Sequence, residues 1–239
     1  MSPPPLLLAN PFVDAYLYSD WLGRGIFISL YLLSILTWVI LIFKWLQLSR
    51  AKAQGKAFIK QCASPTHPSE NPTFEGDPIH NPCASLYLSV KQHVGTLLQK
   101  RPSQSTLTHT DLDFLESRLN AEISHLVSLL DSHLYLLSTI VALAPFLGLL
   151  GTVWGIMAGF TSMQNLTTGA LSNQAVLGGL SLALATTVLG LIDAIPALIG
   201  YNHLKQLLRE VEAELDAFSS RMITSVEFQY CREDVEEIP

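Results

Sequence analysis

One carboxylate stands out in this chain as a group that could handle a proton inside a membrane. No Asp, Glu, Lys or Arg occurs in the 59 residues from Leu134 to Ile192, and Asp193 follows directly. An ionisable side chain in a membrane helix costs about 2.5 to 3.5 kcal/mol on insertion scales, so it indicates function by default. Asp193 therefore indicates ion or proton passage, unless the helix ends early enough to leave it solvated at the membrane interface.

Thr152 offers a hydroxyl within a stripe of small residues on the expected second membrane helix. At roughly 100 degrees per residue, the stripe falls within about 60 degrees of one face. Its members are Pro145, Gly148, Thr152, Gly155, Gly159 and Met163. Gly151, Gly155 and Gly159 also form a double GxxxG pattern, which lets helix backbones approach closely. The stripe predicts a subunit contact or a pore lining, although plain helix packing also explains the glycines, and Thr152 could bond back to its own helix.

A second small and partly polar face follows on the expected third membrane helix. It comprises Gly179, Thr186, Gly190, Asp193, Ala197 and Gly200, with Ala183 at its edge. Pro196 frees a backbone carbonyl close to Asp193. A face without large apolar side chains suits another protein helix or a water-containing pore better than lipid.

Apolar helices must position these groups, and the composition predicts three of them. The chain has 239 residues, of which 49% are hydrophobic and only 14% charged, whereas a soluble chain carries roughly 25% charged residues. One membrane helix needs about 20 mostly apolar residues. The predicted fold is an all-α polytopic membrane protein with three transmembrane helices, at residues 26–46, 134–163 and 175–201.

Basic residues predict the orientation, because they stay on the inner side of the membrane. Arg24 is the single basic residue in the N-terminal segment 1–25, and the loop 164–174 has none. Those that follow the first and third spans are Lys44, Arg50, Lys52, Lys56, Lys60, Lys205 and Arg209. The segment 1–25 and the loop 164–174 are therefore expected outside, and residues 47–133 and 202–239 inside.

The inner insert is predicted in two parts. Five prolines in residues 62–82 indicate an irregular linker. From Asp111, apolar residues recur at three- and four-residue spacing, which predicts an amphipathic helix capped by Thr110 or Asp111. The stripe is Leu112, Leu115, Leu119, Ile123, Leu126 and Leu130. No breaker precedes Pro145, so this helix is expected to run straight into the second span.

The third span is also expected to continue as an amphipathic helix below the membrane. Its apolar stripe is Leu204, Leu207, Leu208, Val211, Leu215, Phe218 and Met222. Two such extensions predict a helical bundle on the inner side, formed within one subunit or between subunits.

Enzymatic and nucleic-acid functions find no support in the motifs. Four histidines of the insert are far apart, and His125 and His133 lie about 80 degrees apart around a helix without a third ligand, so no metal site is expected. There is no phosphate-binding GK[ST] loop and no basic arm, so neither a cofactor nor nucleic acid is expected. Cys62, Cys83 and Cys231 form no CxxC pair and indicate free thiols in a reducing compartment.

Two motifs resemble those of a known family. Residues 144–157, Ala-Pro-Phe-Leu-Gly-Leu-Leu-Gly-Thr-Val-Trp-Gly-Ile-Met, closely resemble the second-span motif of the MotA/TolQ/ExbB proton channel family. Residues 185–202, which include Gly190 and the Ala-Ile-Pro-Ala run at 194–197, are similar to its third-span motif. The MotA branch has four spans, so three spans and a large first inner loop point to the TolQ/ExbB branch.

The resemblance implies a subunit of an energy-transducing motor in the bacterial inner membrane, with a periplasmic N-terminus and a cytoplasmic C-terminus. Such subunits form a homopentamer around a TolR/ExbD-like single-span partner, whose Asp takes up and releases protons. Proton flow moves the partner, which transmits work across the periplasm through a TolA- or TonB-like protein. The resemblance also implies that the protein contacts membrane lipid.

The resemblance also assigns residues of the ion pathway. The two functional threonines of the family correspond to Thr152 and Thr187, and a one-residue slip would put Thr186 in place of Thr187. The family has a Glu five residues before the second threonine, where this chain has Leu182, which cannot bind a proton. Asp193 lies eleven residues further on, about 20 degrees around the helix and about 16 Å nearer the cytoplasm. It is therefore predicted as an exit relay rather than a direct replacement.

Three other functions stay open. A non-conducting membrane scaffold that packs through its glycine faces is compatible with the missing Glu. A MotA-like flagellar stator subunit is disfavoured by the three spans. A solute transporter is disfavoured by the same small number of spans and by the absence of an internal repeat.

Overall fold

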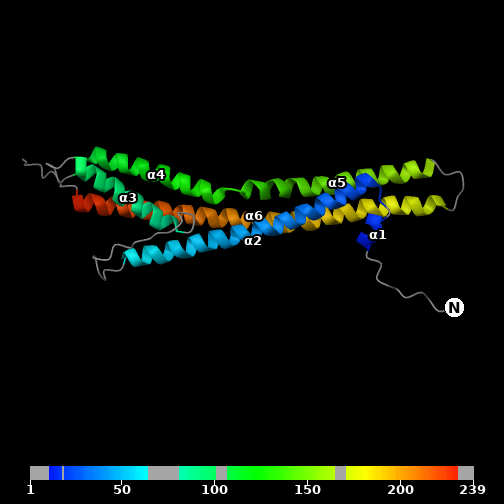
Figure 1. The fold of residues 1–239 in the computed structure, drawn as a ribbon, viewed down its shortest axis with the longest axis horizontal. Coiled ribbons are helices and arrows are strands. Elements are labelled where there is room, and N and C mark those ends of the chain that lie inside the picture. Colours follow the sequence, from blue (N-terminus) through cyan, green and yellow to red (C-terminus); the bar gives the residue numbers. More distant parts are fainter. Residues whose placement is uncertain (1–10, 18, 64–80, 101–106, 165–170, 231–239) are drawn as a thin grey trace, which may run out of the picture. The chain divides into compact units, whose positions relative to one another are not determined.

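The computed structural model describes residues 11–17, 19–63, 81–100, 107–164 and 171–230. Within these ranges every regular element is an α-helix (Figure 1). The helices are α1 (Pro11–Leu17), α2 (Trp21–Ala63), α3 (Pro82–Lys100), α4 (His109–Asp131), α5 (Leu134–Gln164) and α6 (Leu171–Tyr230). Most of the loop 164–174, most of the proline-rich linker and the end of the C-terminal tail lie outside the described residues.

Three of the helices are long and apolar enough to cross a membrane. The ranges that qualify are Trp21–Cys62, Leu134–Thr161 and Val176–Tyr230. The all-α, three-span fold expected from the composition is therefore confirmed.

The chain divides into two compact units, and the long helices α2 and α6 contribute to both. Unit 1 comprises residues 1–42 and 133–202, and unit 2 comprises residues 43–132 and 203–239. Unit 1 holds the three most apolar stretches, and unit 2 holds α3, α4 and the amphipathic ends of α2 and α6.

In unit 1, α2 runs parallel to α6 and α5 runs antiparallel to it. Gly23 lies against Leu182 and Leu41 lies against Gly200, so positions in contact differ by 159 residues at both places. On the other side of α6, Gly148 and Gly155 of α5 lie against Gly190 and Gly179, in reverse order. The α5–α6 pair is therefore a hairpin, as the sequence predicts for its second and third spans.

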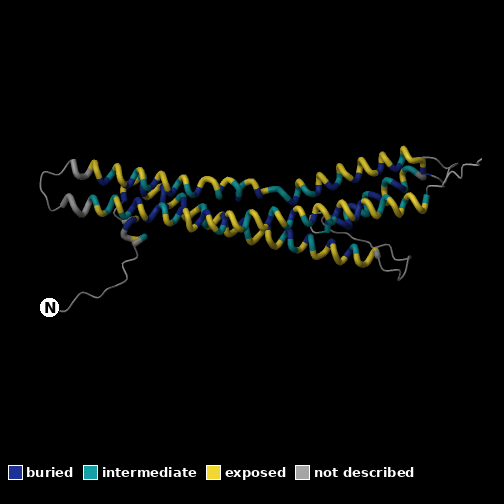
Figure 2. The backbone as a smooth tube through the Cα atoms, turned by 180° about the vertical axis from the view of Figure 1, so that it is seen from behind, coloured by how far each residue is buried: buried dark blue, intermediate teal, exposed yellow. Residues whose placement is uncertain are grey.

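Large apolar side chains also point away from the interior of unit 1. Exposed examples are Tyr31, Trp38, Phe146, Val153, Phe160, Leu184 and Ile195. Figure 2 shows such exposed positions, in yellow, recurring along the same helices as the buried ones. A soluble protein rarely leaves so much apolar surface exposed, so these faces are suited to lipid or to neighbouring protein.

Unit 2 is a small helical bundle with an apolar interior. All six members of the α4 stripe predicted from the sequence are buried, which confirms that prediction. The Phe58 ring of α2 contacts Tyr87 of α3 and Phe218 of α6, with ring centroids 5.8 and 6.1 Å apart. Around this interior, α2 and α6 are joined by Lys52–Glu210 and by Lys56–Glu214 at 3.3 Å. Exposed ion pairs contribute little to stability. The buried apolar stripe therefore contributes most of the stability of unit 2.

Local sequence features explain the starts of α1 and α4. Pro11 opens α1, because a proline at the first helical position sacrifices no intrahelical hydrogen bond. α4 is capped at Thr108 rather than at Thr110 or Asp111. Asp111 instead accepts the Thr108 backbone N–H at 3.1 Å, as the third residue of a capping box does.

The expected continuous helix from the insert into the second span is wrong. α4 ends at Asp131 and α5 begins at Leu134, with Ser132 and His133 between them. His133 has a φ of 70°, the left-handed region that costs a non-glycine residue about 1 to 2 kcal/mol. No glycine or proline occupies the break, so the sequence carries no local signal for it.

Candidate functional site

The hairpin of α5 and α6 is held together by glycines whose backbones touch. A β-carbon added to Gly155 would lie 2.5 Å from Gly179 O, and one added to Gly179 would lie 2.5 Å from Gly155 O. A β-carbon on Gly190 would lie 3.2 Å from the Gly148 Cα. A side chain at any of these positions would force the helices apart. These glycines therefore lie between two helices of one chain, which is the helix packing that the sequence also allowed, and a role at a subunit contact or pore lining stays a prediction.

The remaining glycines of the double GxxxG pattern meet α6 differently. A β-carbon on Gly151 would collide with the Thr186 side chain. At Gly159 the nearest atoms belong to Val176, and a β-carbon would lie 3.8 Å from its carbonyl oxygen. Close packing is thus tightest at the centre of the hairpin and relaxes toward the loop.

Thr152 and Thr186 both donate their hydroxyl protons to their own helices. Thr152 Oγ1 donates to Leu149 O at 2.6 Å, and the fully buried Thr186 donates to Leu182 O at 2.9 Å. The back-bonded alternative considered for Thr152 is therefore the arrangement in the structure. A hydroxyl that donates a hydrogen bond to its own helix keeps lone pairs on its oxygen, and these can accept a hydrogen bond from another group.

Thr187 is the threonine that joins the two helices. Its Oγ1 lies 3.2 Å from Ala183 O on its own helix and 3.3 Å from Gly148 O of α5, so the hydroxyl proton is shared between two carbonyls. Thr152 follows Gly148 by four residues, about one helical turn. The hydroxyl of Thr187 therefore meets α5 one turn from Thr152, within a stretch that contains no charged side chain.

Asp193 lies on a different side of α6 from the threonine and glycine contacts with α5. It is 6% exposed, and the side chain of Ser34 on α2 is its hydrogen-bond partner. About two helical turns further on, Gly200 packs against Leu41 of α2. The single small and polar face expected on the third span is thus divided, with Gly179, Thr186 and Gly190 toward α5 and Asp193 and Gly200 toward α2.

Leu182, at the position where the resembling family has Glu, is a core residue. It is 1% exposed and clusters with Ala15, Phe27 and Ala185. A β-carbon on Gly23 would lie 2.8 Å from Leu182 Cδ2, so the leucine fills the space above that glycine. Position 182 therefore serves packing in this chain, and a carboxylate there would be surrounded by apolar atoms.

Two further polar contacts in unit 1 were not foreseen from the sequence. Ser34 is the partner of Asp193, and the Trp154 indole N–H donates to the Asp20 carboxylate at 3.2 Å. Ser34 sits in an apolar run, where a lone serine carries no distinctive signal. Asp20 precedes the first span by one residue, and the tryptophan is 134 residues away, so only the fold brings them together.

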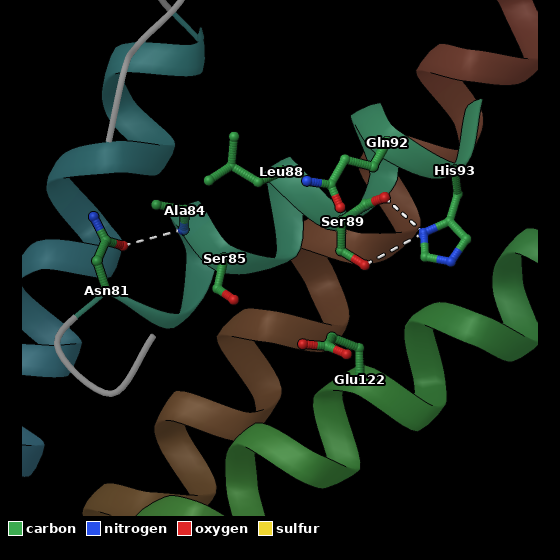
Figure 3. Close-up of a pocket in the computed structure, with 8 residues that line it drawn as sticks. All are labelled: Asn81, Ala84, Ser85, Leu88, Ser89, Gln92, His93 and Glu122. Carbon is green, nitrogen blue, oxygen red and sulfur yellow. Dashed lines mark hydrogen bonds between the residues drawn. The ribbon is translucent and has the colours of Figure 1, made fainter. Parts of the chain in front are cut away.

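A separate cavity of about 410 Å³ lies in unit 2 between α3 and α4. Ser85, Ser89 and His93 of α3 line it together with Glu122 of α4 (Figure 3). His93 Nδ1 donates to Ser89 O at 2.7 Å. Among the residues that the structure describes, no group of three or more His, Cys, Asp and Glu side chains is placed to hold a metal ion.

Comparison with known proteins agrees with these features. The profile of the MotA/TolQ/ExbB proton channel family matches residues 90–217, which span α4, α5 and most of α6. The chain is 28% identical over 195 residues to the biopolymer transport protein ExbB of Neisseria meningitidis, covering 82% of this chain and 87% of that one. It is 30% identical over 218 residues to ExbB of Pseudomonas putida, covering 88% of this chain and 62% of that one.

A TolQ protein is similar over the central helices. The Tol-Pal system protein TolQ of Haemophilus influenzae is 32% identical over 106 residues, covering 44% of this chain and 46% of that one. Together with three apolar helices, these relatives make the chain a multi-pass protein of the bacterial inner membrane and an energy-transduction subunit of the TolQ/ExbB type. The family profile covers more than half of the chain, and the chain belongs to the MotA/TolQ/ExbB proton channel family, in its TolQ/ExbB branch.

Proposed function

We propose that this chain forms a ring, a homopentamer, around the membrane helix of a TolR/ExbD-like partner and couples the proton motive force to work across the periplasm. The partner's Asp carries the proton, and a TolA- or TonB-like protein receives the motion. The observation that carries the proposal is that the Thr187 hydroxyl meets α5 at Gly148 O, about one turn from Thr152, in a stretch without charged side chains. Thr152 and Thr187 are the two positions that match the functional threonines of the family.

The chemistry of the two hydroxyls supports this proposal. Each donates its own proton to a backbone carbonyl, Leu149 O for Thr152 and Gly148 O or Ala183 O for Thr187. Each therefore presents lone pairs, which accept a hydrogen bond from a protonated carboxyl or from a water that carries a proton. Within an uncharged apolar stretch such acceptors are worth more than they are in water. Asp193 is proposed as a relay further toward the cytoplasm.

The double substitution of Thr152 and Thr187 by Val tests the proposal. Val keeps the volume of Thr but removes the hydroxyl, so we expect the ring and its partner to assemble while proton-driven work falls at least about tenfold. Co-purification with the partner measures assembly, and proton flux into proteoliposomes measures the activity. Thr161→Val, on the same helix α5, is the matched control and should leave both unchanged. Full proton flux in the double variant would contradict a role for the two threonines in the pathway.

The proposed orientation has a periplasmic N-terminus and a cytoplasmic C-terminus. It rests on the basic residues that follow α2's apolar part and on those near Lys205 in α6. The cysteines of unit 2 provide reporters. Cys62 is exposed, whereas Cys83 is buried, and this burial raises the pKa of its thiol to about 12.

Labelling with a membrane-impermeant maleimide tests this orientation in a Cys231→Ser background. Cys62 should react only after the inner membrane is permeabilised, and an introduced Thr168→Cys should react in intact cells. Cys83 should stay unlabelled at pH 8 in both preparations, because a thiol with a pKa of about 12 is almost wholly protonated there and the thiolate is the reactive form. Labelling of Cys62 in intact cells would reverse the orientation.

A non-conducting scaffold is the second candidate function. The observation that favours it is the burial of Leu182 in an apolar cluster, which leaves α6 without a carboxylate at the position where the family has one. Under this alternative the glycine contacts and the exposed apolar faces would serve assembly alone. Proton flux in reconstituted complexes separates the two functions, because a scaffold gives a ring with its partner and no flux.

A further inference from the structure

The break between α4 and α5 occurs where the sequence alone predicts a continuous helix. Residues 131–134 contain neither Gly nor Pro, and His133 adopts the left-handed conformation that a residue with a β-carbon rarely takes. Something outside this segment must therefore favour the break. The hydrogen bonds at the end of α4 identify it.

The last carbonyls of a helix have no partner within the helix and need donors from elsewhere. Ser132 supplies two of them: its N–H donates to Ser128 O at 3.1 Å, and its Oγ donates to Leu129 O at 2.6 Å. Lys44 of α2 supplies the third, because its Nζ donates to Leu130 O at 3.1 Å. In a continuous helix that carbonyl would instead accept the N–H of Leu134, four residues on.

Lys44 is unusually placed for a lysine. Its side chain is 1% exposed, although lysine is almost never fully buried unless it is paired. Besides Leu130 O, its ammonium lies 3.4 Å from Ser132 Oγ and close enough to Asp131 to be attracted by the carboxylate. A positive charge at the C-terminal end of a helix is also favoured by the helix dipole. The Lys44 ammonium thus contacts three consecutive residues, 130–132.

A second lysine holds the same turn from α6. Lys205 Nζ forms an ion pair with the Asp131 carboxylate at 2.8 Å. The end of α4 is therefore held by one cation on α2, through the backbone, and by another on α6, through a side chain. Of these two lysines, only Lys44 bonds to a backbone carbonyl, and in a continuous helix that carbonyl would accept a backbone N–H.

We infer that Lys44 acts as a helix breaker supplied by another helix: its ammonium imposes the end of α4, and α4 and α5 join into one helix when it is disengaged. The break is then a conformational device with two states that differ in which N–H the Leu130 carbonyl accepts. This inference goes beyond the proposed function and does not depend on it, since the two states differ only in whether the Leu130 carbonyl accepts the Lys44 ammonium or the Leu134 N–H.

The test is hydrogen–deuterium exchange of the peptide 128–138 in the full-length protein reconstituted in nanodiscs. Lys44→Met keeps an unbranched apolar stem but removes the donor, so helix 109–164 should become continuous and exchange in this peptide should slow by roughly tenfold. Lys44→Arg keeps a cation with several donors and should exchange as the wild type does. Lys60→Met, an exposed lysine on the same helix α2, is the matched control and should change nothing in this peptide.

A compensating substitution makes the test independent of how well Lys44→Met folds. His133→Gly removes the penalty of the left-handed conformation, so the break should persist without Lys44, and Lys44→Met/His133→Gly should exchange as the wild type does. Unchanged or faster exchange in Lys44→Met overturns the inference. If Lys44→Met does not fold, the double variant should recover folded protein with wild-type exchange, and failure of that recovery also overturns it.

Discussion

Asp193→Asn should leave the complex assembled and remove most of its proton-driven activity. The Asn side chain keeps the volume of Asp193 and can still hydrogen-bond to Ser34, but it cannot take up and release a proton. If Asp193 relays protons toward the cytoplasm, we expect a loss of about a hundredfold, in the range for removal of a proton-transfer group. Proton flux in proteoliposomes measures the activity, and co-purification of the partner verifies assembly.

The position of Asp193 makes its control variant informative. The Asp193 residue is 6% exposed and its carboxylate faces α2, whereas Thr187 of the proposed pathway is at the contact with α5. Ser34→Ala removes the hydrogen bond but keeps the carboxylate, so it should retain most of the flux. If Asp193→Asn is fully active while Asp193→Ala destabilises the protein, the residue holds α2 to α6 and carries no proton.

Gly155→Leu should prevent the α5–α6 hairpin from forming. Its β-carbon alone would lie 2.5 Å from Gly179 O and 2.9 Å from Ala183 N, and both are backbone atoms that cannot rotate away. Overpacking a well-packed interior costs about 1 to 3 kcal/mol even where side chains can adjust, so the cost here should reach or exceed the top of that range. We expect little folded protein after purification in detergent, measured by size-exclusion chromatography and thermal unfolding.

Two matched substitutions separate this steric effect from the general effect of a new side chain. Gly25→Leu adds the same side chain to the membrane helix α2, where nothing lies within 4 Å of the added β-carbon, and it should be tolerated. Gly159→Ala should also be tolerated, since its β-carbon would meet only Val176 at 3.8 Å. A Gly155→Leu protein as stable as Gly25→Leu would contradict the close contact between the two backbones.

Much of the fold follows from patterns that are local in the sequence. Composition and uncharged runs predict three membrane helices, and the three- and four-residue spacing from Leu112 to Leu130 predicts the buried face of α4. The helix α3 was not predicted although its pattern was present: its buried residues Cys83, Leu86, Val90 and Val94 recur at three- and four-residue spacing. The break at Ser132–His133 could not be predicted, because Lys44, 86 residues from Leu130, supplies the bond that favours it.

The site was less predictable than the fold, for a physical reason. Spacing along a helix states which residues share a face, but it does not state which neighbour covers that face. The face from Gly179 to Gly200 spans more than one side of α6, so it meets α5 at one set of positions and α2 at another. Leu182 could be recognised as unable to bind a proton, yet its packing against Gly23 depends on the parallel course of α2 and α6.

The contact between Gly155 and Gly179 has a mechanical consequence. Two backbones meet there without intervening side chains, so no rotamer can yield when the hairpin is pulled or sheared. Such a joint is stiff: it stays closed or opens as a whole, because packed interiors have discrete arrangements and do not deform continuously. Under load, α5 and the first half of α6 should therefore behave as a single rod, and any elastic compliance has to reside in other parts of the chain.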